Sequence, residues 1–238
     1  MNANDLLRAG RLSEAIQALN EEVRQAPADA QKRTFLFELL CFAGEYDRAE
    51  RQLDALSNDN KNVQMGALLY RAALAAERVR HKFFQQGDYK NHAAAAEQVA
   101  GMLNGGAFQT IGDADPRIGS RLEVLAGGDY LWIPFEQIAS IRMQPPKRLR
   151  DLLWAPVLLQ TGPECKHRDL GEVLVPVIYP GSFRHEDENV RLGRATTWAE
   201  QDDSELPFGQ KLLLVDGEEV PFLEIRELIL AKAEAAAS

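Results

Sequence analysis

Few residues in this chain have the types and spacing that chemistry requires. Asp113 and Asp115 lie two positions apart and could share a proton as an acid–base pair or hold a cation. Nothing after Pro116 continues a calcium loop, so a turn in which the carboxylates accept backbone N–H groups is the favoured interpretation. Cys165 and His167 are two close metal ligands, whereas a zinc site needs three or four. Neither pair predicts a complete site.

The other candidates are basic residues around a proline pair. Arg142, Lys147, Arg148 and Arg150 surround Pro145-Pro146 and could bind a phosphate group. In an acidic chain a solvated turn is the favoured interpretation. No catalytic set assembles from these residues, so we predict a protein that is not an enzyme and that uses no cofactor or metal.

Composition limits the remaining function classes. The 238 residues carry 27 Lys and Arg against 36 Asp and Glu, a formal net charge of −9 at pH 7. Non-specific nucleic-acid binding needs a positive surface, so we expect no nucleic-acid partner. No apolar run is long enough to span a membrane, and no basic start precedes an apolar block, so we expect no membrane association or export. Only two cysteines occur, which predicts a cytoplasmic protein without disulfides.

Helix-breaking residues divide the chain into two parts. Residues 1–100 contain one proline and four glycines, whereas residues 101–238 contain ten and thirteen. Proline-poor, alanine-rich sequence favours helices, and frequent Pro and Gly favour short strands and turns. The sequence therefore predicts an α+β protein with a helical domain over 1–105 and a β-rich domain over 106–238, joined near Asn104-Gly105-Gly106.

The first part contains an internal repeat of 34 residues, the period of the tetratricopeptide helix–turn–helix unit. Gly44 permits a tight turn between antiparallel helices, Tyr46 fills the gap beside it, and Ala49 lets the helices approach closely. A third, stretched unit is predicted, with one helix from about Val63 to Phe83 and another from Ala93 to Met102. The matching positions are Leu6, Ala9, Gly10, Ala15 and Leu19 in the first unit and Leu40, Ala43, Gly44, Ala49 and Leu53 in the second.

The second part has the pattern of antiparallel strands. Gly127-Gly128-Asp129 separates two short apolar runs, and Asp216-Gly217 separates two more, as in β-hairpins. Further strands are predicted over 155–160, 172–178 and 194–198. Short strands at this density predict a sheet curled toward a small barrel. Residues 226–237 fit either a helix or a final strand with a frayed tail.

The order of motifs in the second part resembles the ImpE family, also called SciE-type or TagJ, which are accessory proteins of bacterial type VI secretion. The resemblance covers the whole chain and is most specific from about residue 105 to Glu224. Its motifs contain Asp113, Asp115, Trp132, Trp154, Pro156, Tyr179, Arg191, Gly193, Arg194 and Trp198, and we expect these residues to serve mainly in packing and turns.

The resemblance implies a non-catalytic cytoplasmic adaptor. Proteins of this family are linked to the small subunit of the contractile sheath (TssB-like) and, through it, to sheath handling by the ClpV ATPase. A helical-repeat surface without a catalytic set also suits the binding of a peptide or helix. We expect the partner to contact Leu36, Phe37, Leu40, Tyr46 and Tyr70 of the helical domain.

Two other function classes stay open. A cryptic enzyme of the β domain would use Asp113 and Asp115 with Arg191 or Arg194. A ligand-binding or nucleic-acid-binding β module would use the basic turn around Pro145-Pro146. The positions of the two aspartates and the two arginines distinguish these hypotheses. An enzyme needs the four side chains within a few ångströms of each other in a pocket, whereas positions scattered along turns favour the adaptor.

Overall fold

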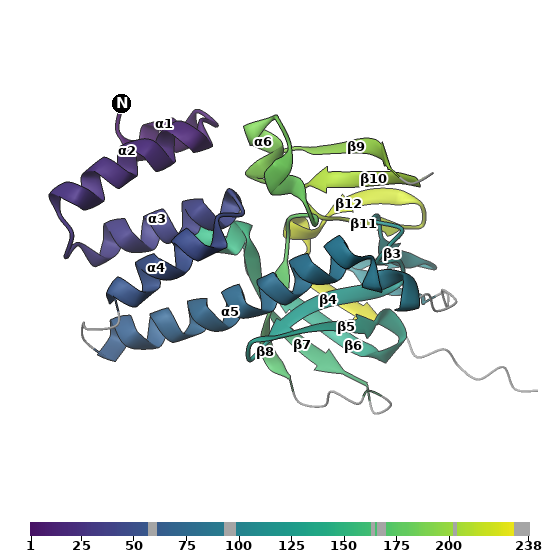
Figure 1. The fold of residues 1–238 in the computed structure, drawn as a ribbon. Helices are drawn as coiled ribbons and strands as arrows, with labels where there is room; N and C mark the ends of the chain where they lie inside the picture. The colour runs from purple at the N-terminus through teal and green to yellow at the C-terminus, as the bar shows by residue number, and fades with distance from the viewer. Residues whose placement is uncertain (57–60, 93–98, 163–164, 166–169, 202–203, 231–238) are drawn as a thin grey trace, which may run out of the picture.

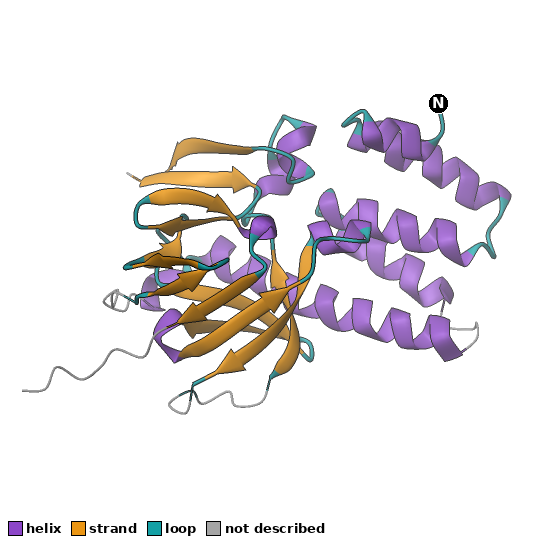
Figure 2. Ribbon diagram, turned by 180° about the vertical axis from the view of Figure 1, so that it is seen from behind, coloured by secondary structure: helices purple, strands orange, loops and turns teal. Residues whose placement is uncertain are grey.

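The computed structural model describes residues 1–238 except for 57–60, 93–98, 163–164, 166–169, 202–203 and 231–238. Helices form the first part of the chain and antiparallel sheets form the second, and the two parts lie side by side (Figures 1 and 2). The α+β class predicted from the sequence is confirmed.

Paired helices build the first part, and the repeated glycines form their turns. Gly10 and Gly44 both have positive φ angles, 77° and 71°, which glycine adopts without a Cβ clash. Asp29 begins α3 by accepting the backbone N–H groups of Gln31 and Lys32. The helices are α1 (Ala3–Arg8), α2 (Leu12–Gln25), α3 (Ala30–Phe42), α4 (Tyr46–Leu56) and α5 (Lys61–Gln86), followed by the 3₁₀ helix η1 (Asp88–His92).

Three antiparallel sheets build the second part. The largest has eight strands in the linear order β2-β1-β13-β6-β7-β8-β4-β5; the other two are β12-β11-β3 and β10-β9. The strands are β1 (Gly101–Leu103), β2 (Gly106–Phe108), β3 (Ile111–Asp113), β4 (Arg121–Ala126), β5 (Asp129–Pro134), β6 (Ile138–Met143), β7 (Trp154–Thr161), β8 (Gly171–Pro176), β9 (Thr196–Gln201), β10 (Ser204–Gly209), β11 (Leu212–Val215), β12 (Glu218–Pro221) and β13 (Glu227–Leu230). Short helices connect them: η2 (Phe135–Gln137), η3 (Leu149–Leu152), η4 (Ser182–Arg184), α6 (Glu188–Arg191) and η5 (Phe222–Glu224).

Both predicted hairpins are present. Gly127 and Gly128 connect β4 to β5, and Asp216 and Gly217, with φ angles of 51° and 85°, connect β11 to β12. Positive φ at both central residues matches the right-handed twist of the flanking strands. At the C-terminal end, Glu227–Leu230 forms a strand, and residues 231–237 lie outside the described part of the chain.

The structure corrects the predicted junction. Asn104 and Gly105 have φ angles of 48° and 88° and form the turn between β1 and β2, so the boundary placed at residue 105 divides a hairpin. β1 also pairs with β13, which means that Gly101 and Met102 lie in a strand and not in the predicted helix. Most of that predicted helix, residues 93–98, lies outside the described residues. The change from helix to sheet falls between His92 and Gly101.

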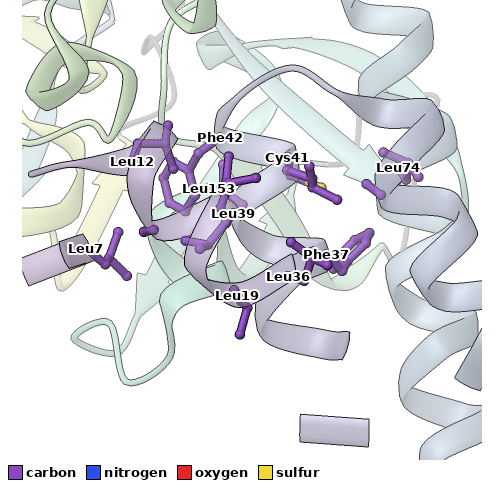
Figure 3. Close-up of a cluster of buried hydrophobic side chains, with 14 of the residues drawn as sticks. Leu7, Leu12, Leu19, Leu36, Phe37, Leu39, Cys41, Phe42, Leu74 and Leu153 are labelled. Carbon is purple, nitrogen blue, oxygen red and sulfur yellow. The ribbon is translucent and has the colours of Figure 1, made fainter. Parts of the chain in front are cut away.

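The helical part and the sheet part share a hydrophobic core. One buried cluster contains Leu12, Phe37 and Leu39 of the helices together with Leu153, the residue before β7 (Figure 3). Trp154, the first residue of β7, belongs to the same cluster. A second cluster lies within the sheets, with Phe135 and Phe222 among its fully buried side chains. Helix α5 joins the two parts because it packs along α4 at one end and along β4 and β5 at the other (Figure 1).

Candidate functional site

A buried ion-pair network connects helix α5 to the sheets. The Arg80 guanidinium of α5 donates Nε to Glu123 Oε1 at 2.7 Å and Nη2 to Glu123 Oε2 at 3.0 Å. The Lys211 ammonium donates to Glu123 Oε2 at 2.8 Å and to Asp113 Oδ2 at 2.5 Å. All four side chains are buried. Glu123 of β4 therefore presents its carboxylate to Arg80 of helix α5. Lys211, the residue before β11, connects this pair to Asp113 of β3.

Neutral donors and further carboxylates complete the network. Tyr130 of β5 donates its hydroxyl to Glu123 at 2.6 Å. Glu77, one turn before Arg80 on α5, accepts from Arg80 at 2.9 Å and from the Trp154 indole N–H at 3.1 Å. Because each charged group has several partners, the cost of removing it from water is offset within the network.

The two carboxylates that bind Lys211 have pKa values shifted in opposite directions. Burial raises the pKa of Asp113 to about 6, since the attraction of Lys211 only partly offsets it and Asp115 repels a second negative charge. Burial also acts to raise the pKa of Glu123, but Arg80 and Lys211 together outweigh it and hold that pKa well below its ordinary value. As pH falls, Asp113 therefore takes up a proton before Glu123 does.

The Asp113-Ala114-Asp115 segment forms the turn that the sequence favours. Asp113 accepts the backbone N–H of Asp115 at 2.9 Å, and Asp115 accepts that of Arg117 at 2.9 Å. The Arg117 guanidinium also binds the Asp115 carboxylate, with Nη2 at 2.6 Å from Oδ2. Both carboxylates therefore stabilise the loop between β3 and β4.

The two arginines of the alternative enzyme, Arg191 and Arg194, bind other partners. Arg194 donates to the backbone carbonyls of Leu7 and Arg8 at 2.6 and 3.2 Å, which stabilises the C-terminal end of α1. Arg191 lies 3.5 Å from Glu188 on the short helix α6. Asp113 binds Lys211, and Asp115 binds Arg117. The four side chains do not converge on one catalytic pocket.

The glycine and the proline of the family motifs occupy specific backbone positions. Gly193 has a φ angle of 63° at the end of α6, and a Cβ there would meet the Ile178 side chain at 3.0 Å. Pro156 lies in β7 opposite Leu174.

The aromatic residues of the motifs pack within the fold. Tyr179 is fully buried, and its hydroxyl both donates to the Leu212 carbonyl and accepts from the Leu212 N–H at 2.9 Å. Trp132 packs against Phe83 of α5 at 5.1 Å between ring centres, and Trp198 pairs with Pro207 across the β9–β10 hairpin.

Comparison with known proteins identifies this arrangement. The family model described as ImpE protein matches residues 105–229, more than half of the chain. The chain belongs to the ImpE family. The type VI secretion system accessory component TagJ of Pseudomonas aeruginosa is similar to this ImpE-family protein, with 32% identity over a 261-residue alignment that covers 96% of this chain and 90% of TagJ. The resemblance found from the sequence motifs is confirmed.

A crystal structure also matches the whole ImpE-family chain. The protein is from Vibrio parahaemolyticus, and the two folds superpose with a TM-score of 0.84, covering 99% of each chain. The sequences are 23% identical, so this match establishes a shared fold.

The expected partner residues of the ImpE-family protein are mostly inside its core. Leu36, Phe37 and Leu40 are buried, because α3 is packed between neighbouring helices and the start of β7. A partner cannot reach these three side chains in this structure, which corrects the expected contact surface. Tyr46 and Tyr70 are half-buried; Tyr70 donates its hydroxyl to Glu38 at 2.8 Å, and Tyr46 packs on His81 and Phe183.

An exposed apolar stripe lies instead on α5. Met65, Leu68 and Val79 are 71%, 63% and 53% exposed, and Leu69 beside them is 46% exposed. With Ala72 and Ala75, they follow the spacing 65-68-72-75-79, which alternates three and four residues as in a coiled-coil seam. We call Met65, Leu68, Leu69, Ala72, Ala75 and Val79 the α5 stripe.

The basic residues around Pro145-Pro146 and the Cys165–His167 pair are the other candidate sites of the ImpE-family protein. Arg142 pairs with Glu227 at 2.9 Å, whereas Arg150 lies over the Tyr70 ring at 5.5 Å, so the basic residues around the prolines face different neighbours. Within the described residues, no group of three metal-ligating side chains occurs, and His167 lies outside them. None of the described helices is long and apolar enough to cross a membrane.

The sequence analysis did not predict the ion-pair network of Arg80, Glu123 and Lys211, although the position of Glu123 indicates a buried charge. Glu123 lies between Leu122 and Val124 in a strand whose two faces are both buried. A carboxylate at such a position requires a cationic partner, because an unpaired buried charge is too costly. The sequence does not say which of its 27 basic residues supplies it.

Proposed function

We propose that this protein is a cytoplasmic, non-catalytic adaptor of a bacterial type VI secretion system. It binds the small contractile-sheath subunit, TssB-like, and through it assists sheath handling by the ClpV ATPase. Membership of the ImpE family, together with the 32% identity to a protein named as a type VI secretion accessory component, is the observation that supports this role. Asp113 and Asp115 pair with Lys211 and Arg117, whereas Arg191 and Arg194 bind Glu188 and the end of α1, so these contacts favour the adaptor over the alternative enzyme.

The α5 stripe is the surface that we assign to the sheath subunit. Helix pairs α1–α2 and α3–α4 have glycine at the same turn position, which is the pattern expected of tetratricopeptide-like hairpins, and α5 follows them. The last helix of a stacked array ordinarily has a polar outer face for solubility. An exposed seam of Met, Leu and Val is therefore suited to an amphipathic helix of a partner.

The chemistry of the stripe predicts how the complex responds to salt. Its exposed positions are apolar, and the neighbouring Arg71 and Arg78 are already paired with carboxylates of α4. At about 25 cal/mol per Å² of apolar area, a few buried Leu-sized side chains support micromolar binding after association costs. Raising the ionic strength should weaken such a complex only modestly, because screening acts on exposed charge.

Calorimetry with the full-length protein and a helical peptide from the sheath's small subunit tests this proposal. Leu68→Asp should reduce the affinity at least about tenfold, because it buries a carboxylate in the seam. Leu158→Asp makes the same change at a 45% exposed position of β7 and should leave the affinity unchanged. Equal loss in both variants would place the site elsewhere, and failure of the wild-type protein to bind any sheath component would overturn the adaptor proposal.

A further inference from the structure

A crevice runs between the C-terminal half of α5 and the turn that follows β8. Its outer part has a volume of about 470 Å³ and lies between α5, the turn at Pro180 and Gly181, and the β9–β10 hairpin. An inner cavity of about 40 Å³ continues from it and shares His81, Pro180 and Gly181 as lining residues. The outer part is large enough to take several side chains of a ligand, and the inner part takes little more than a water molecule.

The lining of this crevice is basic although the chain is acidic overall. Arg117, Arg184, His81 and His185 line the outer part, and no described residue lining that part is a carboxylate. In the inner cavity, Glu77 is the one carboxylate among the described lining residues, and it is already bonded to Arg80 and Trp154. In a protein with a net charge of −9, the two arginines Arg117 and Arg184 give this crevice a local positive charge that favours an anionic ligand.

Arg184 is the cation best placed to bind such a ligand. The Arg117 guanidinium forms an ion pair with the buried Asp115 carboxylate and lies 5.0 Å from the Phe84 ring centre. Arg184 is exposed, has no ion pair within the described residues, and lies 5.2 Å over the Phe183 ring. The planar guanidinium is thus held by an aromatic ring with its charge available to a carboxylate.

Apolar groups beside these cations determine the shape of the ligand. Phe84 of α5 and Phe208 of β10 both line the outer part of the crevice. The His185 ring lies 6.3 Å from Phe208, and its Nδ1 accepts the backbone N–H of Asp187, so a second ring lies beside Phe208 at this opening. A small free anion uses only the cations, whereas a peptide that carries both carboxylates and an aromatic side chain uses the whole surface.

We propose that this crevice binds an acidic, aromatic-containing peptide segment of a partner protein. The crevice and the α5 stripe use different faces of α5. At 3.6 residues per turn, His81 and Phe84 of the crevice lie on roughly the opposite side of the helix axis from Ala75 and Val79 of the stripe. The protein therefore has two independent partner surfaces, one apolar and one basic. This site goes beyond the proposed sheath contact and does not depend on it.

Fluorescence anisotropy with the full-length protein tests the crevice. The probe is a fluorescein-labelled pentapeptide, Glu-Glu-Phe-Glu-Glu, and Lys-Lys-Phe-Lys-Lys is the charge-reversed control. Arg184→Glu should weaken binding of the acidic probe by about tenfold or more, because it places a carboxylate beside the bound carboxylates. Arg24→Glu makes the same charge change at an exposed position of α2 and should alter the affinity by less than about twofold. Raising the NaCl concentration from about 0.05 to about 0.5 M should strongly weaken the binding of the acidic probe, because salt screens the attraction between the charges.

Each alternative result has a defined meaning. Equal effects of Arg184→Glu and Arg24→Glu, or equal binding of the two peptides, would overturn the proposal. Inorganic phosphate that displaces the probe with an affinity as high as the peptide's own would also overturn it, because the crevice would then be a site for small anions. Sheath-peptide binding should be unchanged in Arg184→Glu, so that failure at the crevice and failure at the α5 stripe are distinguishable.

Discussion

Arg80 on helix α5 binds both carboxylate oxygens of Glu123 on strand β4, at 2.7 and 3.0 Å, with both side chains buried. This pair joins the helical array to the sheets at the place where α5 passes beside β4 (Figure 1). Two parallel N–H···O bonds fix the orientation of a guanidinium on a carboxylate as well as its distance. The helix and the strand are therefore held in one geometry.

Removing Arg80 should destabilise the protein far more than removing a neighbouring arginine. We expect Arg80→Met to lower the free energy of unfolding by about 3–5 kcal/mol, because Glu123 keeps its charge in the interior with Lys211 as its remaining cationic partner. Arg78 lies on the same helix as Arg80 but pairs with Asp47 and Glu50 of α4 at the surface. Arg78→Met should therefore cost at most about 1 kcal/mol. Urea unfolding of both variants measures this difference, and similar losses would contradict it.

Asp113 should make the protein more stable as the pH falls from 7 to 5. Its pKa in the folded protein is about 6, above its value of about 3.9 in an unfolded chain, so the folded state binds more protons over this range. The free energy of unfolding should gain about 1 kcal/mol from this group between pH 7 and 5. Glu123 has the opposite shift, and its contribution is lost only below about pH 4.3.

Urea unfolding at pH 7, 6 and 5 tests this assignment. Asp113→Asn resembles the protonated side chain, so the stability of the wild-type protein relative to this variant should increase from pH 7 to pH 5. The lowered pKa of His81 acts in the opposite direction, but it acts in both proteins and cancels in this comparison. Asp216→Asn is a matched control, since Asp216 is an exposed turn residue whose pKa is lowered by the backbone N–H groups of Gln109 and Thr110. An identical pH dependence in wild-type protein and Asp113→Asn would show that Asp113 is not the titrating group.

Trp154 should contribute to stability mainly through packing. It is buried, its ring centre is 6.4 Å from that of Phe37, and its N–H donates to Glu77. Trp154→Ala should cost about 3–5 kcal/mol, as truncation of a large buried side chain does. Trp154→Phe keeps an aromatic ring but loses the hydrogen bond to Glu77, and it should cost less. Thermal unfolding compares the two, and a stable Trp154→Ala variant that has lost its partner would make Trp154 an interface residue.

Asn104 should stabilise the edge of the large sheet. Its side chain accepts the backbone N–H groups of Arg226 and Glu227 at 2.8 and 3.1 Å and donates to the Glu224 carbonyl at 3.2 Å. Asn104→Ala loses these bonds and places alanine at a φ angle of 48°, so it should cost about 1–3 kcal/mol. Asn104→Asp keeps the acceptor oxygen and should cost less. Hydrogen exchange at β13 measures the effect, and unchanged protection in Asn104→Ala would contradict it.

Local chemistry allowed the sequence by itself to determine the turns and the class of the fold. Gly10 and Gly44 permit the same helical turn 34 residues apart, and Asp216-Gly217 permits a two-residue hairpin, because a positive φ depends mainly on the residue itself. Asn104-Gly105 carries the same signal, but its polarity and small side chains also fit a linker. The order of the motifs from Asp113 to Trp198 is itself sufficient to identify the family.

Only the tertiary structure decided which residues are buried and which are available to partners. Leu36 and Phe37 have the composition of a binding surface, yet they lie in the core, whereas the equally apolar Met65 and Leu68 are exposed. Each helix offers apolar residues, and the faces that become buried depend on neighbours distant in the sequence. The pairing of Arg80 with Glu123 has the same origin, because a buried charge is stable only where the fold brings its counter-charge within hydrogen-bond distance.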